Sequence, residues 1–210
     1  IYGAAVKIAM LMAMLTQAFR YAYEPFVFAG SKEKDSRKTY ADAMKFFIIF
    51  TLLAYLAVMF YMDILKYIIP PDYWPGLKVV PIVMVAEIFM GIYFNLSFWY
   101  KLIDETRWGA YFSIIGCAVL ITINVLFIPR FSYMACAWAG FAGYGVAMLL
   151  SYFVGQKKYP INYDLKAIFL YLLVAALLYA AAMLLPIENL WLRMAYRTLL
   201  LLLFVGYIVK

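Results

Sequence analysis

Apolar residues along this chain form seven long runs that are separated by short polar segments. Each run is long enough for a helix that crosses a bilayer, because the hydrocarbon core takes roughly 20 helical residues to cross. The runs fall at 2–28, 44–69, 77–100, 108–128, 133–155, 166–185 and 190–209. The pattern therefore predicts an all-α, polytopic membrane helix bundle with about seven transmembrane helices.

Composition supports a membrane protein and narrows its chemistry. Hydrophobic residues make up 69% of the chain and charged residues 14%, whereas an average soluble domain has about half and a quarter. The chain has no histidine, which excludes His-based acid–base, nucleophile-activating and metal-ligand chemistry. Cys117 and Cys136 fall inside predicted spans, where neither a structural disulfide nor a metal site is expected. We expect no catalytic residue, no metal and no cofactor.

Lysine and arginine residues gather in loops and near helix ends. The net charge of +7 therefore reflects membrane insertion, and no nucleic-acid partner is expected. Nine of these residues flank one set of loops and four flank the other. The positive-inside rule predicts cytoplasmic loops at 30–43, 101–107 and 156–165. Outer loops are expected at 70–76, 129–132 and 186–189, so that the chain starts outside and ends in the cytoplasm.

A polar stripe continues the small-residue face of the first predicted helix. The face holds Ala5, Ala9 and Ala13, followed by Gln17, Arg20 and Glu24. At 100° per residue, all of these positions fall within one third of the helix circumference. Small residues permit close helix approach in lipid, and polar groups on the same face must contact protein or a water-filled cavity. Gln17, Arg20 and Glu24 are therefore the candidate substrate-binding residues.

Arg20 has two interpretations. A fixed guanidinium near the cytoplasmic end of the helix could hold a phosphate or pyrophosphate through a bidentate bond. Alternatively, Arg20 and Glu24 form an i,i+4 ion pair near the helix end. The sequence leaves both open.

Glu87 is the most deeply placed carboxylate, near the middle of the third predicted helix. Gly91 and Asn95 lie on the same face, four and eight residues further on. An ionisable residue at membrane depth is costly and indicates function. Glu87 could exchange a proton or bind a cation that powers transport, or it could neutralise Arg20. Glu87 and Asn95 are therefore candidate coupling or counter-ion residues.

Three further polar residues lie close to the predicted outer ends of helices. Lys7 points away from the alanine face and is expected to extend to the interface. Asp63 is expected to be hydrated, and Asn124 to hydrogen-bond a neighbouring helix.

The segment from Asn124 to Ala139 (NVLFIPRFSYMACAWA) resembles bacterial polysaccharide (O-antigen type) flippases of the multidrug/oligosaccharidyl-lipid/polysaccharide exporter superfamily. In those proteins a helix ends with Asn and a short Ile-Pro turn before a Gly/Ala-rich helix. Gln17 to Phe26 and the loop from Lys101 to Arg107 are similar to other parts of the family, and the likeness covers essentially the whole chain. Family members commonly have Gly where this chain has Ser132 and Ala135.

The resemblance implies a fourteen-helix transporter with two lobes around a central cavity, which works by alternating access. It implies the bacterial cytoplasmic (inner) membrane and an undecaprenyl-diphosphate-linked oligosaccharide as cargo, with possible proton or sodium coupling. On this basis residues 1–155 are the five helices of the second lobe and residues 156–210 two additional carboxy-terminal helices. The amino-terminal half of the same chain would then be the missing partner, alongside membrane lipid.

Two other functions remain open. A MATE-like small-molecule exporter has the same architecture. A membrane-embedded polyprenyl-phosphate glycosyltransferase would need clustered acidic metal ligands, but Asp63 and Asp72 are separated by a turn and have no obvious partners.

Overall fold

The computed structural model describes residues 2–29, 36–185 and 187–209. Within these ranges the chain is helical and has no strand. Seven helices are long and apolar enough to cross a membrane, which confirms the predicted all-α polytopic bundle. The long helices are α1 (Tyr2–Ala29), α2 (Ser36–Phe60), α4 (Val80–Leu96), α6 (Arg107–Phe131), α7 (Tyr133–Lys158), α8 (Leu165–Leu184) and α9 (Leu190–Val209).

Short helical pieces connect the long helices at both ends of the bundle. Beyond α2 the chain forms α3 (Met62–Leu65) and the 3-10 helices η1 (Lys66–Ile68) and η2 (Pro71–Val79). The last of these leads directly into α4, and α5 (Phe98–Leu102) continues the chain beyond it. Proline has no backbone N–H to donate, which explains why the segment with Pro70, Pro71 and Pro75 leaves regular α-helix.

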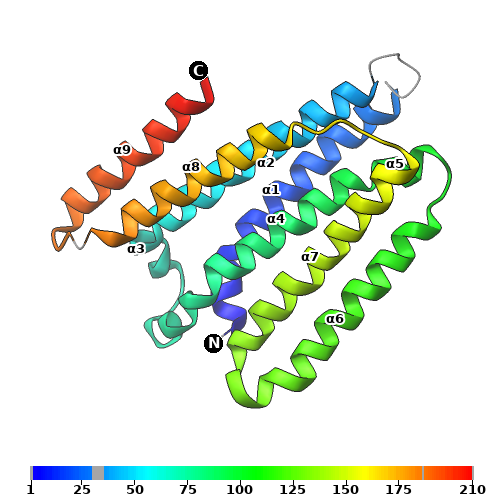
Figure 1. Ribbon diagram of the computed structural model, residues 1–210. Helices are drawn as coiled ribbons and strands as arrows, with labels where there is room; N and C mark the ends of the chain where they lie inside the picture. Colours follow the sequence, from blue (N-terminus) through cyan, green and yellow to red (C-terminus); the bar gives the residue numbers. More distant parts are fainter. Residues whose placement is uncertain (1, 30–35, 186, 210) are drawn as a thin grey trace.

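The helices lie in an extended array (Figure 1). Helices α1, α2 and α4 form the centre, with α7 and then α6 on one side and α8 and then α9 on the other. A small-residue face on α1 lets the centre close up, since Ala5 and Ala9 are fully buried against α4. Packing on the other side joins Leu56 and Phe60 of α2 to Phe204 of α9.

Two boundaries differ from those expected. The second helix begins at Ser36 and ends at Phe60, whereas the hydropathy pattern predicted 44–69. Its first turns are polar but helical, because Tyr40 anchors them by donating to the carbonyl of Val27 at 3.3 Å. The expected Ile-Pro turn is also wrong, because α6 continues through Pro129 to Phe131.

The turn between α6 and α7 is instead the single residue Ser132. Its backbone has φ 50° and ψ −135°, a conformation in which a side chain is strained and glycine is favoured. Ser132 is one of the two positions at which the family that this chain resembles commonly has glycine. The chain turns there at a conformational cost that glycine would avoid.

The loops gather at the two ends of the bundle in the two groups that the sequence predicted, and their assignment to the cytoplasm and the outside stays a prediction. Arg37, at the start of α2, lies 4.4 Å from the centroid of the Tyr159 ring and donates to the carbonyl of Pro160 at 3.3 Å. These contacts put the predicted cytoplasmic segments side by side. At the opposite end, Tyr133 donates to the carbonyl of Pro75 at 3.3 Å. Residues 30–35 and Pro186 of the predicted loops, and both chain ends, lie outside the described residues.

Candidate functional site

Helices α1 and α4 run in the same direction and are in close contact at Gly91. A Cβ built at Gly91 would lie 2.7 Å from Cγ2 of Thr16 and would overlap the ring of Phe47. Only glycine lets α4 approach this closely, and the contact fixes the register of the two helices. Thr16 and Gly91 lie at the same height along the two helix axes. The residues one turn further on, Arg20 of α1 and Asn95 of α4, therefore lie at the same height as well.

Arg20, Glu24 and Lys101 form an ionic cluster one to two turns beyond that contact. Arg20 Nε lies 3.5 Å from Glu24 Oε2, and Lys101 Nζ donates to Glu24 Oε1 at 2.5 Å. The guanidinium of Arg20 also lies 4.6 Å from the centroid of the Phe94 ring on α4. Two cations share one carboxylate, which leaves one positive charge unneutralised.

The cluster is open enough to be reached from outside the bundle. Side-chain exposure is 31% for Arg20, 26% for Glu24 and 29% for Lys101. The structure thus shows the Arg20–Glu24 ion pair that the spacing allowed. It also adds Lys101, which sequence reasoning treated only as a loop charge because it lies 77 residues from Glu24.

Gln17 and Asn95 lie beside this cluster on the same helix faces. Asn95 Nδ2 donates to the Gly91 carbonyl one turn back on its own helix at 3.0 Å. Gln17 Oε1 is buried without a hydrogen-bond partner, as is Arg20 Nε, whose 3.5 Å contact with Glu24 is an ion pair only. We call Gln17, Arg20, Glu24, Asn95 and Lys101 the polar seam.

Glu87 is not part of the polar seam. It precedes Gly91 by one turn while Arg20 follows Thr16 by one turn, so the register separates their backbones by about 12 Å along the helix axes. The acid that neutralises Arg20 is therefore Glu24, and the structure gives no support to Glu87 in that role. No described residue forms an ion pair with Glu87, whose electrostatic neighbours include Tyr2 of α1 and Tyr144 of α7. Its coupling role stays a prediction.

A second ionic cluster ties the α5–α6 loop to the end of α7. Lys158 Nζ and Trp108 Nε1 both donate to Glu105 Oε2 at 2.6 Å. The Lys158 ammonium is the main cause of a lowered pKa of the Glu105 carboxyl, with the Trp108 hydrogen bond second. This cluster holds the loop in place and lies at the surface.

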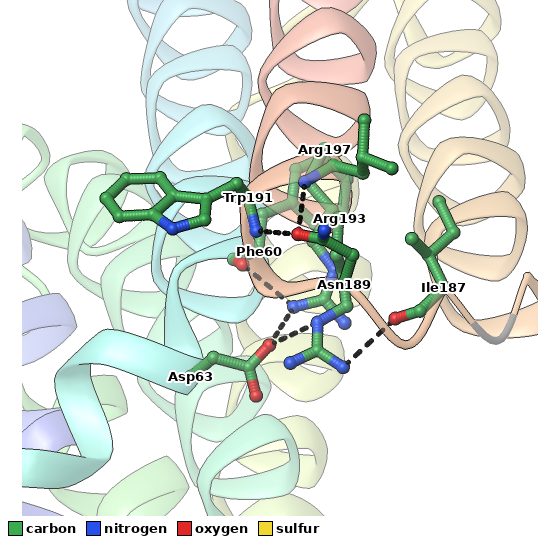
Figure 2. A network of polar contacts seen from close by, with 8 residues as sticks. Phe60, Asp63, Ile187, Asn189, Trp191, Arg193 and Arg197 are labelled. Atoms are coloured by element: carbon green, nitrogen blue, oxygen red, sulfur yellow. Dashed lines mark hydrogen bonds and ion pairs between the residues drawn. The ribbon is translucent and has the colours of Figure 1, made fainter.

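At the opposite end of the bundle, Asp63 is not simply hydrated, and that expectation is wrong. Its Oδ2 lies 3.0 Å from Arg193 Nε and 2.9 Å from Arg197 Nη1 (Figure 2). Arg197 was overlooked in the sequence. Its spacing of four residues from Arg193 was the available signal, because two arginines on one face of an apolar helix require an acidic partner.

An apolar groove runs between α8 on one side and α4 and α7 on the other, with α2 as its floor. Two adjoining cavities of about 360 and 240 Å³ share Ile48, Ile92, Met148 and Ile168. On α8 the lining extends from Leu165 to Tyr179, a helical rise of about 21 Å. The groove is therefore long enough to take much of a lipid chain within one leaflet or across the midplane.

Two other polar residues of the long helices are Lys7 and Asn124. Lys7 is exposed on α1, and Asn124 Oδ1 is buried on α6 without a hydrogen-bond partner, contrary to the expected bond to a neighbouring helix. Among the described residues, no three His, Cys, Asp or Glu side chains lie together so that they could hold a metal ion.

The fold and these sites define a multi-pass α-helical membrane protein. No protein-family model, curated protein or solved structure matches the chain.

Proposed function

We propose that this protein is part of a membrane flippase that moves an undecaprenyl-diphosphate-linked oligosaccharide across the bacterial cytoplasmic membrane. The observation that carries the proposal is the polar seam, in which two cations share one carboxylate at the predicted cytoplasmic end of α1 and α4. A diphosphate needs such a partly solvated, positively charged surface. The planar guanidinium of arginine and the compact ammonium of lysine both bind phosphate oxygens strongly when water is partly excluded.

The apolar groove matches the other part of the proposed substrate, its polyprenyl tail. A polyprenyl tail has no hydrogen-bonding groups, and the lining of the groove is almost entirely aliphatic and aromatic. Burying a hydrocarbon chain there would not leave polar groups without partners. A small-molecule exporter would use the polar seam but has no evident need of this groove.

The charges of the polar seam give each of its residues an expected role in substrate binding. Arg20 and Lys101 would contact the diphosphate, while Glu24 keeps both side chains in place when no substrate is bound. Gln17 and Asn95 would supply uncharged hydrogen bonds beside them. Glu87, deeper in the bundle, is proposed to respond to a proton or cation during the cycle, because an unpaired carboxylate at this depth is costly in its charged form.

Reconstitution of the full-length protein tests the proposal. Proteoliposomes would be loaded with a short-chain polyprenyl-diphosphate oligosaccharide, and the fraction reaching the opposite leaflet would be measured with a membrane-impermeant lectin or glycosidase. Leaflet exchange well above that of protein-free vesicles is the expected result. Transfer of sugar without leaflet exchange would instead favour the glycosyltransferase, and export of a cationic dye alone would favour the small-molecule exporter.

A further inference from the structure

The junction of α9 with the end of α2 is held by a cluster of two arginines and one aspartate (Figure 2). Asp63 Oδ2 accepts from Arg197 Nη1 at 2.9 Å and pairs with Arg193 Nε at 3.0 Å. Arg197 Nη1 also donates at 3.0 Å to the carbonyl of Phe60, the last residue of α2. Arg193 Nη1 donates at 3.4 Å to the carbonyl of Ile187. We call Asp63, Arg193 and Arg197 the α9 cluster.

The α9 cluster carries a positive charge that the described residues do not neutralise. Two guanidiniums face one carboxylate, and no other described acidic side chain forms an ion pair with either arginine. Arg197 is 8% exposed and pairs with Asp63 at 2.9 Å, so the single negative charge of Asp63 largely compensates Arg197. Arg193, whose side chain is 29% exposed, therefore carries the spare positive charge, and a partly desolvated cation is normally matched by an anion.

The hydrogen-bond donors of the cluster are also incompletely used. The Nε atoms of Arg193 and Arg197 are both buried without a hydrogen-bond partner, since the Arg193 N–H does not point at Asp63 although the two atoms are close. Only six buried polar side-chain atoms lack such a partner in the described part of the chain, and two of them lie here. Because both Nε atoms are covered by protein, an added anion can reach the cluster only at the partly exposed part of the Arg193 side chain. The excess positive charge indicates that an anionic group belongs there.

The position of the cluster indicates where that group comes from. Trp191, at the start of α9, is 82% exposed, and Leu190 and Leu192 beside it are exposed as well. A largely exposed tryptophan next to exposed leucines is typical of the depth at which lipid headgroups lie. Asn189 Oδ1 already accepts from the backbone N–H of Trp191 at 2.9 Å, so the site depends on the arginine side chains rather than on the helix end.

We infer that the α9 cluster binds the phosphate of an anionic phospholipid in the leaflet where α9 begins, which the charge pattern identifies as the outer leaflet. The two free oxygens of a phosphodiester match the paired donors of a guanidinium, and the net negative charge of the lipid neutralises the spare cation. The partly exposed edge of Arg193 makes the direct contact, while Arg197 keeps Asp63 and α9 in place behind it. The lipid would thereby fasten α9 to α2. The site lies at the opposite end of the bundle from the polar seam and does not depend on the proposed function.

Lipid binding by the full-length protein in detergent tests this inference. After delipidation, the protein would be titrated with phosphatidylglycerol or phosphatidylcholine, and bound lipid would be counted by native mass spectrometry. We expect phosphatidylglycerol to bind at least ten-fold more tightly than phosphatidylcholine. The Arg193→Gln variant should lose about ten-fold in phosphatidylglycerol affinity, and Arg130→Gln, which removes an exposed cation at the same end, should lose none.

Asp63→Asn separates lipid binding from a purely structural role. This variant weakens the link between α9 and α2 but leaves two unneutralised arginines, so phosphatidylglycerol affinity should rise several-fold while thermal stability without lipid falls. Equal phosphatidylglycerol affinity in the wild type and Arg193→Gln, or a loss of affinity in folded Asp63→Asn, would overturn the inference. Displacement of the lipid by inorganic phosphate at equal concentration would show a free-anion site and overturn the lipid assignment.

Discussion

Gly116 of α6 and Gly143 of α7 lie backbone to backbone, and a Cβ at either position would be 2.9 Å from the carbonyl oxygen of the other. This reciprocal contact brings the backbones of α6 and α7 together. Helix α6 is otherwise exposed along most of its length. Small residues on α7 permit this contact, since Gly143 and Ala147 both face Gly116.

Alanine at Gly143 should therefore destabilise the α6–α7 pair. The new methyl group meets backbone, which cannot move aside cheaply, and overpacking of this kind costs about 1–3 kcal/mol. Gly140→Ala is the matched control on the same helix, because a Cβ there has nothing within 4 Å. Thermal unfolding in detergent should show a lower midpoint for Gly143→Ala only. Equal midpoints in both variants would contradict the close contact.

Glycine at Ser132 should stabilise the protein. The observed φ of 50° strains a residue with a side chain, and such strain costs on the order of 1–3 kcal/mol. Part of the gain is lost because glycine makes the unfolded chain more flexible, so a net gain of about 1 kcal/mol is expected. Ser132→Ala keeps the Cβ and should give no gain. Unfolding midpoints of the two variants in the same detergent provide the measurement.

Acid should loosen the attachment of the α5–α6 loop to α7. Lys158 and Trp108 stabilise the ionised Glu105 and lower the pKa of its carboxyl below the ordinary 4.5. A carboxyl with a lowered pKa contributes stability that is present above its ordinary value and is lost as pH falls below that value toward the folded-state pKa. The wild type should therefore lose stability relative to Glu105→Gln as pH falls below about 4.5. Parallel pH dependence in the two proteins would argue against the Glu105–Lys158 pair.

Transport should depend on the charge balance of the polar seam. Removing one charged contact to a phosphate costs on the order of 1.5–3 kcal/mol, so Arg20→Ala should raise the substrate KM by about ten-fold or more. Lys7→Ala, which removes an exposed cation on the same helix, should leave transport unchanged. Glu24→Gln should lower KM, because it frees both cations for the substrate. Wild-type transport in Arg20→Ala would leave Arg20 with a structural role alone.

Labelling of single cysteines should reveal the orientation. In a background with Cys117 and Cys136 replaced by serine, Asp72→Cys should react with a membrane-impermeant maleimide in intact cells, whereas Arg107→Cys should react only after permeabilisation. Both positions are exposed, so access to the reagent depends on the side of the membrane. The opposite pattern would reverse the predicted topology and place the α9 cluster in the cytoplasmic leaflet.

The amino-acid sequence by itself determined the helices and the grouping of their loops. A helix satisfies its backbone hydrogen bonds within one segment, so about 20 apolar residues suffice to specify a span in lipid. The sequence also offered the Arg20–Glu24 pair as one of two interpretations, because i,i+4 neighbours meet on any helix, and the structure shows this pair. The amino-acid sequence was enough to predict contacts between residues that lie within one or two turns of the same helix.

Only the tertiary structure decided which helices meet and at what register. Lys101 reaches Glu24 across 77 residues, and Arg197 reaches Asp63 across 134. Neither pairing follows from hydropathy, because the contact of Gly91 with Thr16 and the packing of α9 on α2 fix the heights at which these side chains face one another. Helix positions in a bilayer are set by close packing between distant segments, and a shift of one turn would have paired the charges differently.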